Sequence, residues 1–289
     1  MEGEDVLAEA VEAMCKGLGD RLIGAYALGS LSHGGFSPLV SDIDLGLILR
    51  DPVHPEDAER IEAIAAAERV KGSELHARLS VFWGTPATLR GDRAGGRFPA
   101  PDRLDLIQSG RLLWGIDSRD GVPSPTGEEL FVSGAEFALD RLGGVGPQRA
   151  VAGGLSSVQL TIETTTREVL EPTLLIEGGL RRVTKMVLFP IRFLYTAATG
   201  GLGTNDAAVD FHLAREAPAK ALVAAAFGWR RGEPFEPLEA TGLLATEMFP
   251  LYLFYLTDHE ERLRILGRHD LAEQFAGWRS QLTRAASDM

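Results

Sequence analysis

The feature that most constrains this chain is a Gly-Ser pair followed, after a short polar loop, by two aspartates one residue apart. Gly29-Ser30 ends one apolar stretch, and Asp42 and Asp44 open the next. Both apolar stretches have the length and composition of buried strands. Because alternate side chains of a strand point to the same face, we expect Asp42 and Asp44 to project together.

This combination of residues predicts a site for a nucleoside triphosphate. Two neighbouring carboxylates repel each other unless a cation lies between them. Mg²⁺ suits them because it takes oxygen ligands and keeps bound phosphates. Gly29 lets the backbone approach a ligand closely, and N–H groups at a turn attract anions. The hydroxyl group of Ser30 adds a further donor.

The same residues resemble a known family. The order of apolar residue, Gly29-Ser30, loop, and Asp-apolar-Asp is similar to that of the polymerase-β-like nucleotidyltransferases. The fuller pattern of His33-Gly-Gly-Phe-Ser-Pro38 and Ser41-Asp-Ile-Asp-Leu45 most resembles the antibiotic adenylyltransferases of the streptomycin/spectinomycin type. The second half adds to this resemblance with three segments: 185–195, 199–208 and 229–232. The resemblance is firm over 22–50 and looser elsewhere.

The resemblance implies transfer of AMP from ATP to a hydroxyl group of a small molecule, with an aminoglycoside-type antibiotic as a candidate acceptor. Asp42 and Asp44 would be catalytic and would hold Mg²⁺, with two ions expected. The residues expected to bind the nucleotide are Gly29, Ser30, His33, Lys185, Arg192 and Tyr195. Lys185 and Arg192 lie seven residues apart and should share a helix face. Related enzymes tend to have a lysine after the glycine-rich turn that corresponds to 199–203, where this chain has Thr204-Asn205.

The general base is the unresolved part of this prediction. The family usually has a third acidic residue on a neighbouring strand. We expect that strand at 75–83, and Glu74 at its start is the only acid on its polar face. Glu74 is therefore one candidate base. Acids of the second half are the alternative, namely Glu163, Glu168, Glu171 and Asp210.

Two other functions stay open at this point. The chain could lack a base altogether and bind nucleotide as a regulatory protein of the same fold. It could also transfer a nucleotide to a protein instead of a small molecule.

The predicted fold class is an α/β nucleotidyltransferase domain with a mixed sheet flanked by helices, followed by an all-α helical bundle. A cluster of Gly and Pro places the boundary near 125, so the domains are 1–125 and 126–289. We expect a short helix or an ordered loop at 31–37, and Pro190 and Pro250 should kink or divide their helices. The predicted strands are 22–28, 43–49, 75–83 and 111–114. The predicted helices are 4–18, 55–70, 102–109, 133–143, 147–171, 177–199, 204–214, 216–229, 236–265 and 268–285.

The composition limits the classes of substrate and partner that we expect for this chain. The 289 residues are 45% apolar, enough for a real core, and the net charge is −12. An acidic chain disfavours a nucleic-acid substrate and suits a cationic small acceptor. Its one cysteine, Cys15, cannot form an internal disulfide. The acidic first residues do not resemble a signal peptide and no stretch is apolar enough to span a bilayer, so we expect a cytoplasmic protein without a membrane partner.

Overall fold

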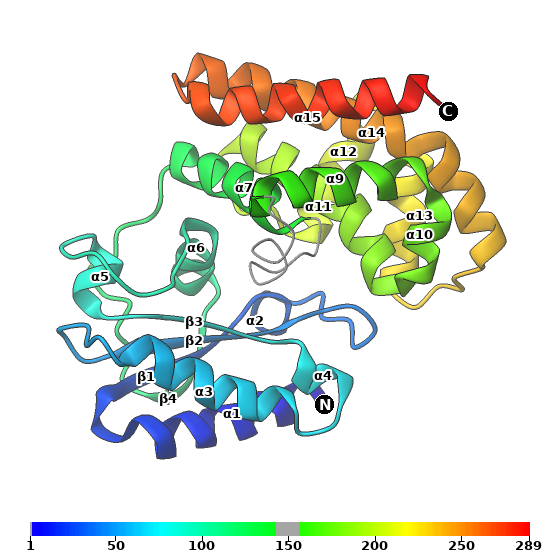
Figure 1. The fold of residues 1–289 in the computed structure, drawn as a ribbon. Coiled ribbons are helices and arrows are strands. Elements are labelled where there is room, and N and C mark those ends of the chain that lie inside the picture. The colour runs from blue at the N-terminus through cyan, green and yellow to red at the C-terminus, as the bar shows by residue number, and fades with distance from the viewer. Residues whose placement is uncertain (1, 143–155) are drawn as a thin grey trace. The chain divides into compact units, whose positions relative to one another are not determined.

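The computed structural model describes residues 2–142 and 156–289. By internal contacts the chain divides into two compact units, Met1–Pro125 and Thr126–Met289. The first unit combines a sheet with helices and the second is helical, which confirms the predicted fold class (Figure 1). Among the described helices, none is long and apolar enough to cross a membrane.

A four-stranded mixed sheet forms the centre of the first unit. Its strands are β1 (Leu22–Leu28), β2 (Ile43–Leu49), β3 (Leu79–Gly84) and β4 (Arg111–Gly115). The strand order is β3-β2-β1-β4. Strand β1 is antiparallel to both β2 and β4, whereas β2 and β3 are parallel. The strands β1 and β2 have the predicted bounds.

The two faces of this sheet differ in what covers them. Helices α1 (Glu2–Leu18) and α3 (Asp57–Arg69) pack against one face, whose side chains include the fully buried Ile43 and Leu45. Helix α6 (Ala100–Gln108) lies on the other side of the sheet (Figure 1). Because β2 alternates, Asp44 faces the side of α6.

The structure corrects the start of the third strand. Residues Glu74–Ala77 form a short helix, α4, and β3 begins only at Leu79. The side chain of Ser73 caps α4 by accepting a hydrogen bond from the backbone N–H of His76. A serine side chain favours such a helix cap over an extended backbone. The alternation of polar and apolar residues predicts a strand here because it does not include this capping preference.

Two further short helices complete the first unit. Helix α2 (Ser30–His33) follows β1, as expected for the segment 31–37, and α5 (Pro86–Arg90) follows β3. Helix α5 was not predicted, although Thr85 and Thr88 form a capping box at its start. Pro86 suits the first turn of such a helix.

The second unit consists of helices in its described part. They are α7 (Gly127–Arg141), α9 (Ser157–Leu170), α10 (Pro172–Glu177), α11 (Gly179–Thr199), α12 (Asn205–Ala214), α13 (Lys220–Arg230), α14 (Pro237–Ile265) and α15 (His269–Ser287). Most of the part of the predicted helix 147–171 that precedes α9 lies outside the described residues. Helix α7 starts earlier than predicted because Thr126 and Glu129 form a capping box.

Neither of the two interior prolines divides its helix. Helix α11 continues through Pro190 and α14 continues through Pro250. The prediction was that each proline kinks or divides its helix, and division occurs at neither. A proline removes one backbone hydrogen bond, and the long buried faces of these helices provide enough packing to outweigh that loss.

An aromatic cluster in the core of the second unit encloses His259. Its imidazole is fully buried and lies 4.4 Å from the ring of Tyr255 and 5.6 Å from that of Phe275, measured between ring centroids. Burial lowers the pKa of His259, and the carboxylate of Asp258, 3.4 Å from Nδ1, opposes that shift only in part. The folded protein therefore keeps this histidine neutral near neutral pH.

We expect acid to destabilise the second unit through His259. The folded pKa is lowered, so the unfolded chain binds the proton first, and stability is lost as the pH falls through the unfolded value. Between about pH 7 and pH 5.5 the loss should be about 1 kcal/mol. Urea unfolding of His259→Phe should show a smaller pH slope than the native chain. His269→Gln changes an exposed histidine and should keep the slope; an unchanged slope in His259→Phe would contradict the assignment.

Candidate active site

The Gly29 turn joins β1 to α2 and has a conformation that only glycine adopts readily. Its φ is +61° and its ψ is −151°. A methyl group added at Gly29 would overlap Oδ2 of Asp44. Glycine is needed here for two reasons, the backbone angles and the close approach of a carboxylate.

Asp44 lies against this turn, and Asp42 stands two residues before it in the chain. Asp42 directly precedes β2 and Asp44 lies within it, and Leu28 of β1 is the register partner of Asp44. Both aspartates are half-buried, whereas the intervening Ile43 is fully buried. This burial pattern is that of two carboxylates on one face of the chain. The carboxylate of Asp44 packs against the turn itself.

These donors fit Mg²⁺. The two carboxylates offer oxygen ligands only, and Mg²⁺ is usually held in proteins by one or two carboxylates together with phosphate and water. Within 2–142 and 156–289, no group of three or more His, Cys, Asp or Glu side chains is placed to hold a metal. Two carboxylates would leave the other ligand positions of the ion to phosphate and water.

Strand β3, the parallel neighbour of β2, carries no acid opposite Asp44. The register partner of Asp44 in the parallel strand β3 is Ser80. The expectation that Glu74 begins this strand is wrong, since it lies in α4 with a side chain that is 87% exposed. Its carboxylate accepts a hydrogen bond from Arg78 at 2.7 Å. The reason is the Ser73 cap, which turns this segment into a helix.

We expect Glu74→Gln to leave any transferase activity within about twofold of the native value, because an exposed carboxylate held by a neighbouring arginine contributes little. Steady-state turnover with saturating ATP is the measurement. A loss of a hundredfold or more would restore Glu74 as the base. Glu62→Gln, which removes an exposed partner of Arg69, is the matched control.

The other predicted phosphate contacts lie in α2. Ser30 is its first residue and is half-buried, and His33 is its last residue and is exposed. The backbone N–H of His33 donates to the carbonyl of Gly29 at 3.1 Å.

Asp105 of α6 is a residue of this region that the sequence reasoning missed. Its side chain is 5% exposed, and its Oδ2 accepts the backbone N–H of Gly29. That N–H is therefore directed at Asp105 and not at a ligand. The available signal was an acidic residue between Leu104 and Leu106, both of which are buried.

In the second unit, Lys185 and Arg192 of α11 share one helix face, as predicted. The Lys185 ammonium lies 5.2 Å and the Arg192 guanidinium 4.9 Å from the centre of the Phe189 ring. Arg192 also donates to the carbonyl of Gly203 and thereby connects the glycine-rich turn 199–203 to α11. Tyr195 packs edge-on against Phe211 of α12 at 5.5 Å.

The acids of the second unit have different surroundings. Glu168 pairs with Arg182 through both carboxylate oxygens, and Glu171 lies 3.6 Å from Arg167. Glu163 and Asp210 are exposed. In the place of the lysine of related enzymes, Thr204 caps α12.

Comparison with known proteins gives one informative result. No family model and no curated protein sequence matches the chain. A search of solved structures matches spectinomycin adenyltransferase AAD(9) from Enterococcus faecialis, crystallised with ATP and spectinomycin. The TM-score is 0.51 at 13% sequence identity, covering 83% of this chain and 98% of that one. The chain has the nucleotidyltransferase fold. This confirms the predicted resemblance at the level of the fold.

Proposed function

We propose that this chain is an ATP- and Mg²⁺-dependent nucleotidyltransferase that transfers AMP to a hydroxyl group of a small molecule. The observation that carries the proposal is the contact between the Gly29 turn and Asp44, with Asp42 beside it. The contact occurs in a fold shared with an enzyme crystallised with ATP. A turn that accepts phosphate and a pair of oxygen ligands are the two parts a triphosphate site needs.

In the proposed reaction, the hydroxyl group and the backbone N–H of Ser30 hold the outer phosphates of ATP. Asp42 and Asp44 hold Mg²⁺, which when bound neutralises charge that develops on the phosphate oxygens. The acceptor oxygen attacks the α-phosphorus and forms the new P–O bond. The bond to pyrophosphate breaks, pyrophosphate leaves with its electron pair, and the hydroxyl proton passes to a base.

We propose a cationic aminocyclitol or aminoglycoside as the acceptor. The net charge of −12 favours binding of a cation over binding of a polyanion. The structurally similar enzyme was crystallised with spectinomycin. If the acceptor is an antibiotic of this class, expression of the chain should raise the resistance of a sensitive bacterial host.

Nucleotide binding without efficient transfer is the second candidate, and Ser80 favours it. This residue lies beside Asp44, on the strand where the resemblance led us to expect an acid. A serine hydroxyl is a poor general base, so a chain of this kind needs a carboxylate from elsewhere. Without one, the protein would bind Mg²⁺-ATP and release it unchanged.

One experiment separates these candidates. The chain is incubated with Mg²⁺, ATP and a panel of aminoglycosides and aminocyclitols, while calorimetry measures ATP binding without acceptor. Acceptor-dependent release of pyrophosphate, with an AMP adduct in the mass spectrum, supports the transferase. Tight ATP binding without pyrophosphate release supports the second candidate. Absence of any Mg²⁺-ATP binding would refute both.

A further inference from the structure

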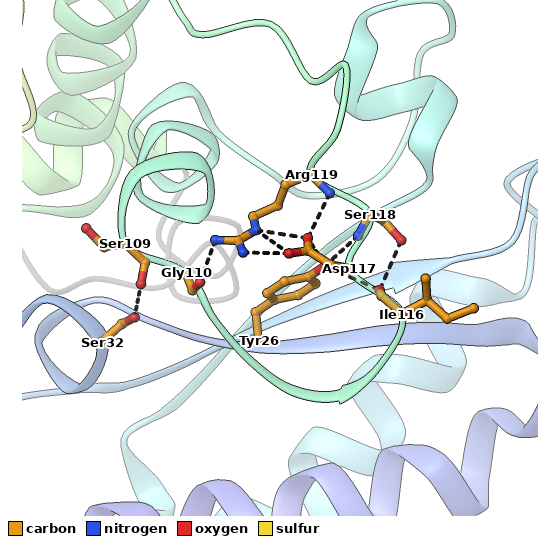
Figure 2. A network of polar contacts seen from close by, with 8 residues as sticks. All are labelled: Tyr26, Ser32, Ser109, Gly110, Ile116, Asp117, Ser118 and Arg119. Carbon is orange, nitrogen blue, oxygen red and sulfur yellow. Dashed lines mark hydrogen bonds and ion pairs between the residues drawn. The ribbon is translucent and has the colours of Figure 1, made fainter.

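Helix α6 and the residue that follows it contact the Gly29 turn at two points. At the first, the backbone N–H of Gly29 donates to Oδ2 of Asp105. At the second, the hydroxyl group of Ser32 donates to the carbonyl of Ser109, as Figure 2 shows. The partners of these two hydrogen bonds are 76 and 77 residues apart in the sequence, so both contacts form only in the folded unit.

The end of α6 is in turn fixed to strand β1. The carbonyl of Gly110 accepts a hydrogen bond from the Arg119 guanidinium at 2.8 Å. Arg119 pairs with Asp117, and the Tyr26 hydroxyl of β1 donates to that carboxylate at 3.1 Å (Figure 2). The guanidinium of Arg119 holds the pKa of Asp117 well below its usual range, so this carboxylate stays charged.

These contacts form a closed path. It leads from Tyr26 along β1 to the Gly29 turn, across to Asp105 and Ser109 in and just after α6, and back through Arg119 and Asp117 to Tyr26. The path includes the Gly29 turn, which lies against the carboxylate of Asp44. A turn held at two points keeps its shape when it is desolvated by a ligand, which lowers the cost of binding.

We propose that Asp105 is a positioning residue for the nucleotide site. It acts through the Gly29 N–H, holding the turn in the glycine-only conformation in which Gly29 lies against the carboxylate of Asp44. This inference rests on the proposed Mg²⁺-ATP site and adds to it a residue outside the Gly-Ser and Asp-x-Asp motifs. The requirement is for a hydrogen-bond acceptor at this position, so asparagine should replace aspartate with little loss.

The test compares Asp105→Ala with Asp105→Asn. Asp105→Ala should weaken Mg²⁺-ATP binding about tenfold, because the half-buried Gly29 N–H loses its acceptor. Asp105→Asn should stay within about threefold of the native affinity, because its amide carbonyl still accepts. Calorimetry with Mg²⁺-ATP is the first readout. The second is hydrogen exchange of the amides of residues 29–33, which should be faster in Asp105→Ala.

Asp57→Ala is the matched control. Asp57 is a 2% exposed carboxylate of the same unit that accepts a backbone N–H from His54 at 2.8 Å, but it lies in α3. This variant should lose thermal stability while keeping native ATP affinity and native exchange of 29–33. The proposal is overturned if Asp105→Ala binds Mg²⁺-ATP like the native chain, or if Asp105→Asn is as weak as Asp105→Ala.

Two further comparisons test the proposal if Asp105→Ala does not fold or if the native chain binds no Mg²⁺-ATP. If Asp105→Ala does not fold, Ser32→Ala removes the second contact without entering the core and should also accelerate exchange of 29–33; native exchange there would overturn the inference. If the native chain binds no Mg²⁺-ATP, the proposed function fails. The exchange comparison of Asp105→Ala with Asp57→Ala then decides alone, and equal rates at 29–33 would refute the positioning role.

Discussion

Asp44→Asn is expected to reduce turnover of Mg²⁺-ATP about a thousandfold or more while the chain stays folded. Asparagine has the shape of aspartate, so the close contact with Gly29 can persist. It lacks the negative charge that would hold Mg²⁺ and, through it, the triphosphate. Asp42→Asn should have a similar effect, since the second carboxylate of the pair has no substitute on β3, where Ser80 lies opposite Asp44.

Pyrophosphate release at saturating ATP measures this effect, with circular dichroism to confirm folding. Asp92→Asn is the control, because Asp92 is an exposed acid of the same unit that pairs with Arg90 at 3.0 Å. It should keep native turnover. Retention of turnover within about tenfold in Asp44→Asn would contradict a metal role for this residue.

Gly29→Ala should have the second large effect. The new methyl group would overlap Oδ2 of Asp44, and the backbone angles of Gly29 disfavour any residue with a Cβ. The strain alone costs about 1–3 kcal/mol, and relief requires Asp44 or the turn to move. We expect Mg²⁺-ATP affinity and turnover each to fall about a hundredfold.

Gly34→Ala separates strain from overlap. Gly34 also has a positive φ, +92°, but a methyl group there would meet nothing within 4 Å. This variant should lose some stability and keep native affinity for Mg²⁺-ATP. Equal losses of affinity in the two variants would show that the contact between Gly29 and Asp44 is unimportant for binding.

Where local sequence dictates structure, the predictions were accurate. The strands β1 and β2 are apolar runs with polar boundaries, and both bounds match. Where a side-chain cap sets the start of a helix, the periodicity of apolar residues predicts the wrong element or the wrong bounds. Ser73 caps a helix at the predicted start of β3, and Thr126 with Glu129 starts α7 earlier than expected.

The candidate site was predictable only in part. Glycine followed by serine and the Asp-x-Asp spacing are local patterns, so Gly29, Ser30, Asp42 and Asp44 could be identified from the sequence. The role of Asp105 depends on a hydrogen bond between residues 76 positions apart, which no local pattern encodes. The register of β3 against β2, which sets Ser80 beside Asp44, also depends on the folded sheet.

A crystal structure of the chain with Mn²⁺ and a non-hydrolysable ATP analogue tests the central claim most directly. Mn²⁺ takes the same oxygen ligands as Mg²⁺ and is located by its anomalous signal. We predict an anomalous peak in contact with the carboxylates of both Asp42 and Asp44, with the outer phosphates of the nucleotide on the turn of Ser30. A nucleotide bound elsewhere, or these two carboxylates without metal at saturating Mn²⁺, would contradict the proposed site.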